Sequence, residues 1–231
     1  MTMWPSADES QALQLSLSVA LRSVLLSLPP ALLVAWVLTR RRFLGRTLLD
    51  AFVHLPLVLP PVMVGYVLLL LFGSRGPLGG WLEREFGIAL IFTRNGAAVA
   101  TAVMSFPLMV RAMRISLETV ERGLEEAACT LGAGAMDRFA TITVPLMMPG
   151  LLAGAVTAFS AALGEFGAVI TFVSNIPGQT RTLPLALYTA LQTPGGETAA
   201  ARLAIISFVL GLSGLLLSEW FARRVRLVLG R

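Results

Sequence analysis

Glu165 is the one carboxylate deep within an apolar stretch of this sequence. An ionisable group in such a stretch is costly to desolvate, so it is a candidate functional group that binds or gates a solute. A fixed negative charge repels anions, however. For an anionic solute, the position favours a structural role, as a helix cap or as the partner of an arginine at the core of a dimer, over direct contact.

The basic side chains are all arginines, 18 in number, and some of them could attract an anion. Arg22, Arg94 and Arg181 fall near the ends of apolar stretches and have the required sign. Long cationic side chains in such positions more often extend toward the membrane surface, so both interpretations stay open. The candidate pathway or gate residues are Glu165, Ser174, Asn175 and Arg181.

The sequence lacks the side chains that a metal site or a catalytic nucleophile would need. Cys129 and His54 are the single cysteine and the single histidine, so one chain cannot assemble a Cys/His zinc site or an internal disulfide. No paired acids and no nucleophile with its base share an apolar stretch. We therefore expect no metal and no catalytic centre in this chain.

The composition is that of a membrane protein. Hydrophobic residues make up 56% of the 231 residues, charged residues only 13%, and the mean hydropathy is +0.79. A soluble domain could not cover itself with so few polar side chains, so lipid must contact much of the surface. The net charge of +5 comes from arginines between apolar stretches rather than along one stripe, which argues against nucleic acid as a partner.

Charge-poor stretches of about 20 residues, the length that crosses a bilayer, recur along the chain. An isolated segment in lipid satisfies its backbone groups only as a helix, so the sequence predicts an all-α polytopic protein with about five transmembrane helices. The predicted spans are 15–39, 51–73, 95–115, 144–172 and 200–221.

Clusters of arginine predict which connections face the cytoplasm. They follow the first predicted span, flank the connection after the third, and end the chain: Arg40, Arg41, Arg42 and Arg46; Arg111, Arg114, Arg122 and Arg138; Arg223, Arg224, Arg226 and Arg231. The N-terminus is therefore predicted to lie outside, with 1–14 as a periplasmic segment, and the C-terminus inside, with 222–231 as a basic cytoplasmic tail.

A shorter apolar segment at 182–193 complicates this topology. As a further crossing it would place the terminal arginines outside, yet about 12 residues reach only about 18 Å as a helix. We predict a short re-entrant or interfacial helix. Packing on the outer loop and lining of a pathway are both consistent with such a helix.

The connection 117–143 is too long for a turn and too patterned for a disordered loop. Apolar residues recur three or four positions apart in its first half, which predicts an amphipathic helix that leaves the membrane. Gly132 and Gly134 then break this helix. A second helix is predicted at 135–142, before Pro145 opens the next span.

A spaced motif lies in this connection: Glu126, Ala127 and Ala128, Gly132 after three further residues, Ile142 after nine more, and then Pro145. It resembles the EAA loop of the type I importer permeases that work with ATP-binding cassette (ABC) ATPases, in which the loop is the coupling helix that sits in a groove of the ATPase. Alanines allow close approach, glycine permits a sharp turn, and a carboxylate gives the partner an oriented charge. Without this motif, a helical hairpin on the membrane surface would be equally consistent.

Further segments are similar to the molybdate-transporting members of that family, namely 55–61 (LPLVLPP), 164–168 (GEFGA), 172–182 (FVSNIPGQTRT) and 191–197 (LQTPGGE). The resemblance covers nearly everything from 15 to 221, which it identifies as a type I transmembrane domain. Sulfate and tungstate permeases share much of the pattern, so the oxyanion class is better defined than the particular anion.

The resemblance implies a function and a set of partners. It implies transport of molybdate across the bacterial inner membrane by alternating access, with tungstate or sulfate as the alternative. The expected partners are a second copy of this chain, two copies of a separate ATPase, and a periplasmic molybdate-binding protein. The chain contains no lysine for a nucleotide-binding P-loop, so ATP and Mg²⁺ are expected on the ATPase and no cofactor on this chain. A passive channel is the alternative from another class, but it would not need a patterned cytoplasmic loop.

Prolines within the predicted spans disturb helical hydrogen bonding, which is tolerable where a helix faces protein or a cavity. They are candidate bend points, although fixed kinks that serve packing are equally consistent. These residues are Pro29, Pro30, Pro60, Pro61 and Pro107.

Overall fold

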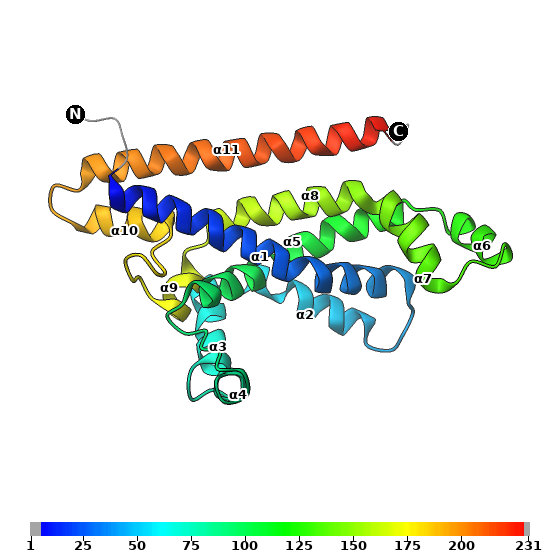
Figure 1. The fold of residues 1–231 in the computed structure, drawn as a ribbon, viewed down its shortest axis with the longest axis horizontal. Helices are drawn as coiled ribbons and strands as arrows, with labels where there is room; N and C mark the ends of the chain where they lie inside the picture. The colour runs from blue at the N-terminus through cyan, green and yellow to red at the C-terminus, as the bar shows by residue number, and fades with distance from the viewer. Residues whose placement is uncertain (1–5, 229–231) are drawn as a thin grey trace.

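The computed structural model describes residues 6–228, apart from the side chains of residues 218, 221, 222 and 224–228. Within this range the regular structure is helical throughout, as predicted, and the long helices run side by side (Figure 1). Residues 1–5 of the predicted periplasmic segment lie outside the described residues. The same holds for residues 229–231 of the predicted basic tail, Arg231 included.

Helix α1 (Ala7–Arg40) begins well before the predicted start at Leu15, because a capping box fixes its first turn. The Ser6 hydroxyl accepts a hydrogen bond from the Glu9 backbone N–H at 3.3 Å, and the Glu9 carboxylate accepts one from the Ser6 N–H at 2.7 Å. Pro29 and Pro30 lie inside α1, which stays one helix.

The predicted single span at 51–73 is wrong in shape, because two helices bent by 115° take its place. Helix α2 (Arg46–Val58) ends before Leu59, and α3 (Pro61–Phe72) begins after Pro60. A proline disfavours helical geometry in the residue before it, and both Leu59 and Pro60 are extended, with ψ of 145° and 133°. The chain thus turns at the proline pair, and α4 (Pro77–Phe86) follows.

Helix α5 (Arg94–Glu118) is capped by the Thr93 hydroxyl, and Pro107 lies inside it without breaking it. It packs closely against α8 (Val144–Leu163). A Cβ at Gly150 would collide with the Ser116 side chain, and one at Gly154 would lie 3.2 Å from the Met109 carbonyl oxygen. Small residues at this crossing let the two backbones approach, as in many membrane helix pairs.

The connection between α5 and α8 holds α6 (Arg122–Thr130), α7 (Ala135–Arg138) and a π-helical segment, η1 (Phe139–Thr143). The first predicted helix therefore divides, because 117 and 118 end α5 and α6 starts only at Arg122. The second is continuous with the next span, so one helical run covers Ala135–Leu163. Pro145 lies in the first turn of α8, as predicted, although η1 leads into α8 without a break.

The predicted span 144–172 is also divided. Helix α8 ends at Leu163, and the short α9 (Gly167–Val173) follows after a break that contains Glu165. The predicted short helix at 182–193 is confirmed as α10 (Leu183–Gln192), which packs on α1 and on the long α11 (Glu197–Val228).

Among the described residues, four helical runs are long and apolar enough to cross a membrane, and the bent pair α2–α3 makes a fifth if it counts as one span. The connection after α1, the α6–α7 region and the end of α11 lie at the same end of the molecule (Figure 1). The three arginine-rich regions therefore share one face, as a cytoplasmic face requires. The start of α1 and the α10–α11 turn lie at the opposite, outer end.

Candidate functional site

The docking loop, defined here as residues 119–138, projects from the cytoplasmic end of the helices (Figure 1). Neither α6 nor α7 contains a buried residue. Of the predicted motif residues, Glu126, Ala127, Gly132 and Pro145 are exposed, and Ala128 and Ile142 are half-buried. The first part of the motif is thus presented on a projecting turn, and Ile142 and Pro145 lie on the helix that leads back into the membrane.

Gly132 turns the chain sharply at the end of α6. Its φ of +87° is left-handed, a conformation that side chains with a Cβ rarely adopt. The Ala133 N–H donates to the Ala128 carbonyl and the Gly132 N–H to the Cys129 carbonyl, each at 3.0 Å. This pair of bonds is a Schellman motif, which ends α6 and satisfies carbonyls that would otherwise be orphaned.

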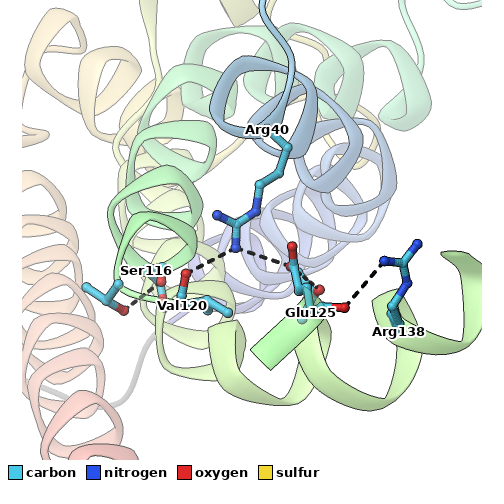
Figure 2. A network of polar contacts seen from close by, with 7 residues as sticks. Arg40, Ser116, Val120, Glu125 and Arg138 are labelled. Atoms are coloured by element: carbon cyan, nitrogen blue, oxygen red, sulfur yellow. Dashed lines mark hydrogen bonds and ion pairs between the residues drawn. The ribbon is translucent and has the colours of Figure 1, made fainter. Parts of the chain in front are cut away.

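Glu125, the neighbour of the predicted Glu126, anchors the loop to the transmembrane helices. Its carboxylate accepts hydrogen bonds from the Arg40 guanidinium at 3.2 Å and from the Thr143 hydroxyl at 2.7 Å (Figure 2). The side chains of Arg40 and Glu125 are only 9% and 21% exposed. The sequence does not reveal this role, because Glu125 and Glu126 are adjacent and identical in type.

Two backbone contacts complete the polar anchor, the name used here for Arg40, Glu125, Arg138 and Thr143. The Arg40 guanidinium also donates to the Val120 carbonyl at 3.2 Å, and Arg138 donates to the Glu125 carbonyl at 3.3 Å (Figure 2). The start of the loop is therefore tied to α1, and its end is tied back to α6. Displacement of α6 would pull on both attachments.

The helices that carry the loop are joined to each other just inside it. The Ser116 hydroxyl donates to the Met147 carbonyl and accepts from the Gly150 N–H, both at 3.3 Å. Leu38, Met113 and Met147 are fully buried around this point. The loop thus rests on a packed unit of α1, α5 and α8.

Three of the predicted pathway residues lie together in the outer connection, residues 174–182. Arg181 donates to the Asn175 side-chain oxygen at 2.9 Å, and the Asn175 amide donates to the Thr189 hydroxyl at 2.8 Å. Ser174 has a φ of +64°, unusual for a residue with a side chain. Bonds within the connection and to α10 hold the loop, with Arg181 half-buried.

Glu165 lies at the other end of α9 from this cluster. Its carboxylate accepts a hydrogen bond from the Ala168 N–H at 2.9 Å, so it caps the short helix. Among the described residues it has no ion pair with an arginine. Of the two structural roles predicted for Glu165, the structure displays the cap.

The other candidate cations also have protein acceptors. Arg22 donates to the Asn95 side-chain oxygen at 2.8 Å, and Arg94 donates to the Gly178 carbonyl at 2.6 Å. Both acceptors are neutral, and within the part of the chain that the structure describes neither arginine has an ion pair. The outer half of the molecule therefore presents positive charge at the junction of α1, α5 and the outer connection.

The single cysteine and the single histidine lie on different helices and share no site. Cys129 is exposed on α6. The His54 ring lies 3.3 Å from the Asp50 carboxylate, one turn earlier on α2. Within residues 6–228, no three His, Cys, Asp or Glu side chains are grouped where they could hold a metal ion.

The family model described as "Binding-protein-dependent transport system inner membrane component" matches residues 27–227, nearly the whole chain. The chain belongs to this family of inner membrane transport components. The docking loop and its polar anchor lie within the matched range, as do α2 to α10, whereas the match begins inside α1, at residue 27. The multi-pass architecture agrees with an inner-membrane location.

Individual relatives of this transport component indicate which members of the family it resembles. It is 58% identical over 223 residues, 96% of this chain and 97% of the relative, to the molybdenum transport system permease protein of Escherichia coli (strain K12). The sulfate transport system permease protein of the same organism is more distant, with 41% identity over 84% of this chain and 71% of the relative.

Solved structures confirm the fold. A chain of a bacterial alginate ABC transporter, crystallised with an alginate-bound periplasmic protein, superposes with a TM-score of 0.75 at 18% identity, over 95% of this chain and 80% of that one. The predicted type I importer fold is thereby confirmed for this transport component.

Proposed function

We propose that this chain is the membrane-spanning subunit of an ATP-driven importer that carries molybdate into the cytoplasm. The observation that carries the proposal is the 58% identity to a molybdenum transport permease, because it extends over 96% of this chain and 97% of the relative. Tungstate and sulfate are the alternative substrates, since a sulfate permease shares 41% identity over a shorter range.

We propose that the docking loop binds a separate ABC ATPase. Its exposed apolar side chains support this role, because Leu131 and Met136 are 88% and 80% exposed on a surface outside the predicted membrane region. Large apolar side chains exposed together at such a place indicate a binding surface. ATP and Mg²⁺ would bind to that partner, and this chain would supply neither a catalytic residue nor a cofactor site.

A second copy of this chain and a periplasmic molybdate-binding protein complete the proposed assembly. A homodimer would bury apolar side chains of the bent pair α2–α3, where Phe52, Val58 and Val62 are 72%, 81% and 55% exposed. The delivering protein would dock at the outer end, where Arg22 and Arg94 supply positive charge.

The proposed mechanism is alternating access driven through the polar anchor. ATP binding closes the two ATPases, and each carries its docking loop with it. Because Glu125 ties that loop to α1 and to the start of α8, the packed helices tilt together and the pathway between the two copies opens outward. Hydrolysis returns the assembly to the inward-open state.

Uptake by the reconstituted complex tests this function. Proteoliposomes that contain this chain, its ATPase and the binding protein should transport radiolabelled molybdate only when ATP is supplied on the side of the membrane that carries the ATPase. An excess of unlabelled tungstate or sulfate then ranks the anions. Uptake that proceeds without the ATPase would indicate a passive channel, and uptake inhibited best by sulfate would reassign the substrate.

A further inference from the structure

A cavity of about 410 Å³ lies beside the polar anchor, between the end of α1 and the α7–η1 segment. Leu33, Trp36 and Phe139 form its apolar wall, and the Trp36 and Phe139 rings meet edge to face with centroids 6.4 Å apart. Arg41 and Arg138 bring positive charge to the same cavity. The site therefore combines an apolar wall with two guanidinium groups.

The positive charge in this cavity is not neutralised by the protein. The Arg41 guanidinium lies over the Trp36 ring at 5.1 Å from its centroid, and among the described residues this guanidinium has no hydrogen bond or ion pair. Arg138 donates only to the carbonyls of Gly134 and Glu125. The Glu125 carboxylate, which also lines the cavity, is already paired with Arg40. An anionic group is what the cavity lacks.

The position of the cavity indicates which anion can reach it. Leu33 is 61% exposed, and Leu25 and Leu26, on the preceding turns of α1, are 62% and 53% exposed, so this side of α1 offers an apolar surface that leads toward the outer end. Trp36 and Arg41 follow at the cytoplasmic end of α1, where tryptophan and arginine side chains meet lipid headgroups.

We infer that this cavity binds an anionic phospholipid, with the phosphate between Arg41 and Arg138 and an acyl chain along Trp36 and Leu33. Anionic lipids of the cytoplasmic leaflet are attracted by arginines at this level. Because Arg138 also holds the Glu125 carbonyl, the bound lipid would lie against the polar anchor and stiffen the attachment of the docking loop. Lipid composition would thus act on the same element that the ATPase moves.

Native mass spectrometry of the complete permease–ATPase complex tests this site. Phosphatidylglycerol and phosphatidylcholine with identical acyl chains are titrated into the detergent-solubilised complex. The complex should retain phosphatidylglycerol in preference to phosphatidylcholine. Arg41→Gln should weaken phosphatidylglycerol retention about fivefold, the effect expected for one cation lost at an anionic membrane surface.

Arg42→Gln is the matched control, because it removes the same charge from the adjacent exposed residue, which does not line the cavity. It should leave phosphatidylglycerol retention within about twofold of the parent, since an exposed charge that does not line the cavity interacts with the phosphate through solvent and salt. Trp36→Leu should weaken retention of the lipid but not of soluble glycerol phosphate, which has no chain to place along the wall.

Specific outcomes would overturn the inference. Equal losses of phosphatidylglycerol retention in Arg41→Gln and Arg42→Gln would show that the lipid responds to general surface charge and not to this cavity. Displacement of the lipid by glycerol phosphate at equal concentration would make this a site for soluble anions. Retention by the isolated chain but not by the complex would assign the cavity to the ATPase interface.

Discussion

The outer connection and the docking loop both join helices at an end of the molecule, but they satisfy their polar groups differently. In the outer connection, Thr180 is fully buried, donates to the Ser174 carbonyl at 3.0 Å and accepts from the Ile176 N–H at 2.9 Å. In the docking loop, α6 has no buried residue, and only its root is fixed, through Glu125. The outer connection therefore has a buried hydrogen-bonded centre of its own, whereas the docking loop is fixed only where it meets the membrane helices.

This difference indicates that the outer connection stabilises the fold, whereas the docking loop can transmit motion to the helices. A segment whose buried core is closed by its own hydrogen bonds, as around Thr180, keeps its shape with two side-chain bonds to its neighbours, from Arg94 on α5 and to Thr189 on α10. A segment with a fixed root and a bare tip can receive force at the tip and deliver it at the root. Changes in the outer connection should therefore reduce stability, whereas changes at the tip of the docking loop should reduce coupling while stability is kept.

The largest effect is expected at the root of the loop, in Glu125→Ala. The variant leaves the nearly buried Arg40 without its carboxylate, and an unpaired buried charge costs about 3 kcal/mol or more. Thermal unfolding of the isolated chain in detergent should show a clear loss, and uptake should fall with it. Glu126→Ala, at the exposed neighbour, should reduce ATP-driven uptake without changing unfolding. Equal unfolding temperatures for the two variants would contradict the polar anchor.

A smaller loss is expected from Thr180→Val in the outer connection. Valine keeps the volume but leaves the Ile176 N–H and the Ser174 carbonyl unsatisfied, at a cost of about 2 kcal/mol. Gln179→Ala alters the exposed neighbour and should be nearly neutral. Both variants can be compared by denaturant unfolding in the same detergent. If Thr180→Val matched its control in stability while losing uptake, the connection would be part of the pathway rather than scaffold.

Gly132→Ala sharpens the comparison within the docking loop itself. Alanine at a φ of +87° is strained by about 1–2 kcal/mol, so the turn at the end of α6 should open and uptake should fall. Gly123→Ala, inside α6 with open space around its Cβ, should instead stabilise the helix by about 0.5–1 kcal/mol. Hydrogen exchange across α6 would detect both changes. Similar exchange in the two variants would show that the turn does not depend on this glycine.

The smallest effect on stability is expected from Leu131→Ser, within about 0.5 kcal/mol for an exposed residue. Its effect should appear in binding of the ATPase, because a side chain that is 88% exposed in this chain would be covered there. Leu44→Ser is the control, since Leu44 is fully exposed in the α1–α2 connection at the same end. Affinity for the ATPase, measured in detergent, should fall only in the first variant.

The sequence predicted what depends on local pattern. Apolar stretches predicted the helices, arginines predicted the shared face, and the spaced motif predicted the projecting turn at Gly132. The start of α1 was predicted too late in the chain, because a search for apolar stretches leaves out polar capping residues such as Ser6 and Glu9. The break around Glu165 was missed for the opposite reason, since an apolar stretch gives no sign of where one helix stops and another begins.

The role of Glu125 could not be predicted, because its partner Arg40 lies 85 residues earlier in the chain. Nothing local distinguishes it from Glu126, and only the crossing of α1 with α5 and α8 brings the two charges together. The bend of 115° at Pro60 was foreseen as a candidate but not as a division of the span, since a proline pair inside α1 leaves that helix whole. Tertiary packing decides between these outcomes.

Chemical labelling of Cys129 tests the central claim most directly, because it is the only cysteine of the chain and is exposed on α6. A membrane-impermeant maleimide should label it in inside-out vesicles but not in intact spheroplasts. Addition of the ATPase should then slow labelling of this chain severalfold. Labelling from the outer side, or a rate that the ATPase leaves unchanged, would contradict a docking loop on the cytoplasmic face.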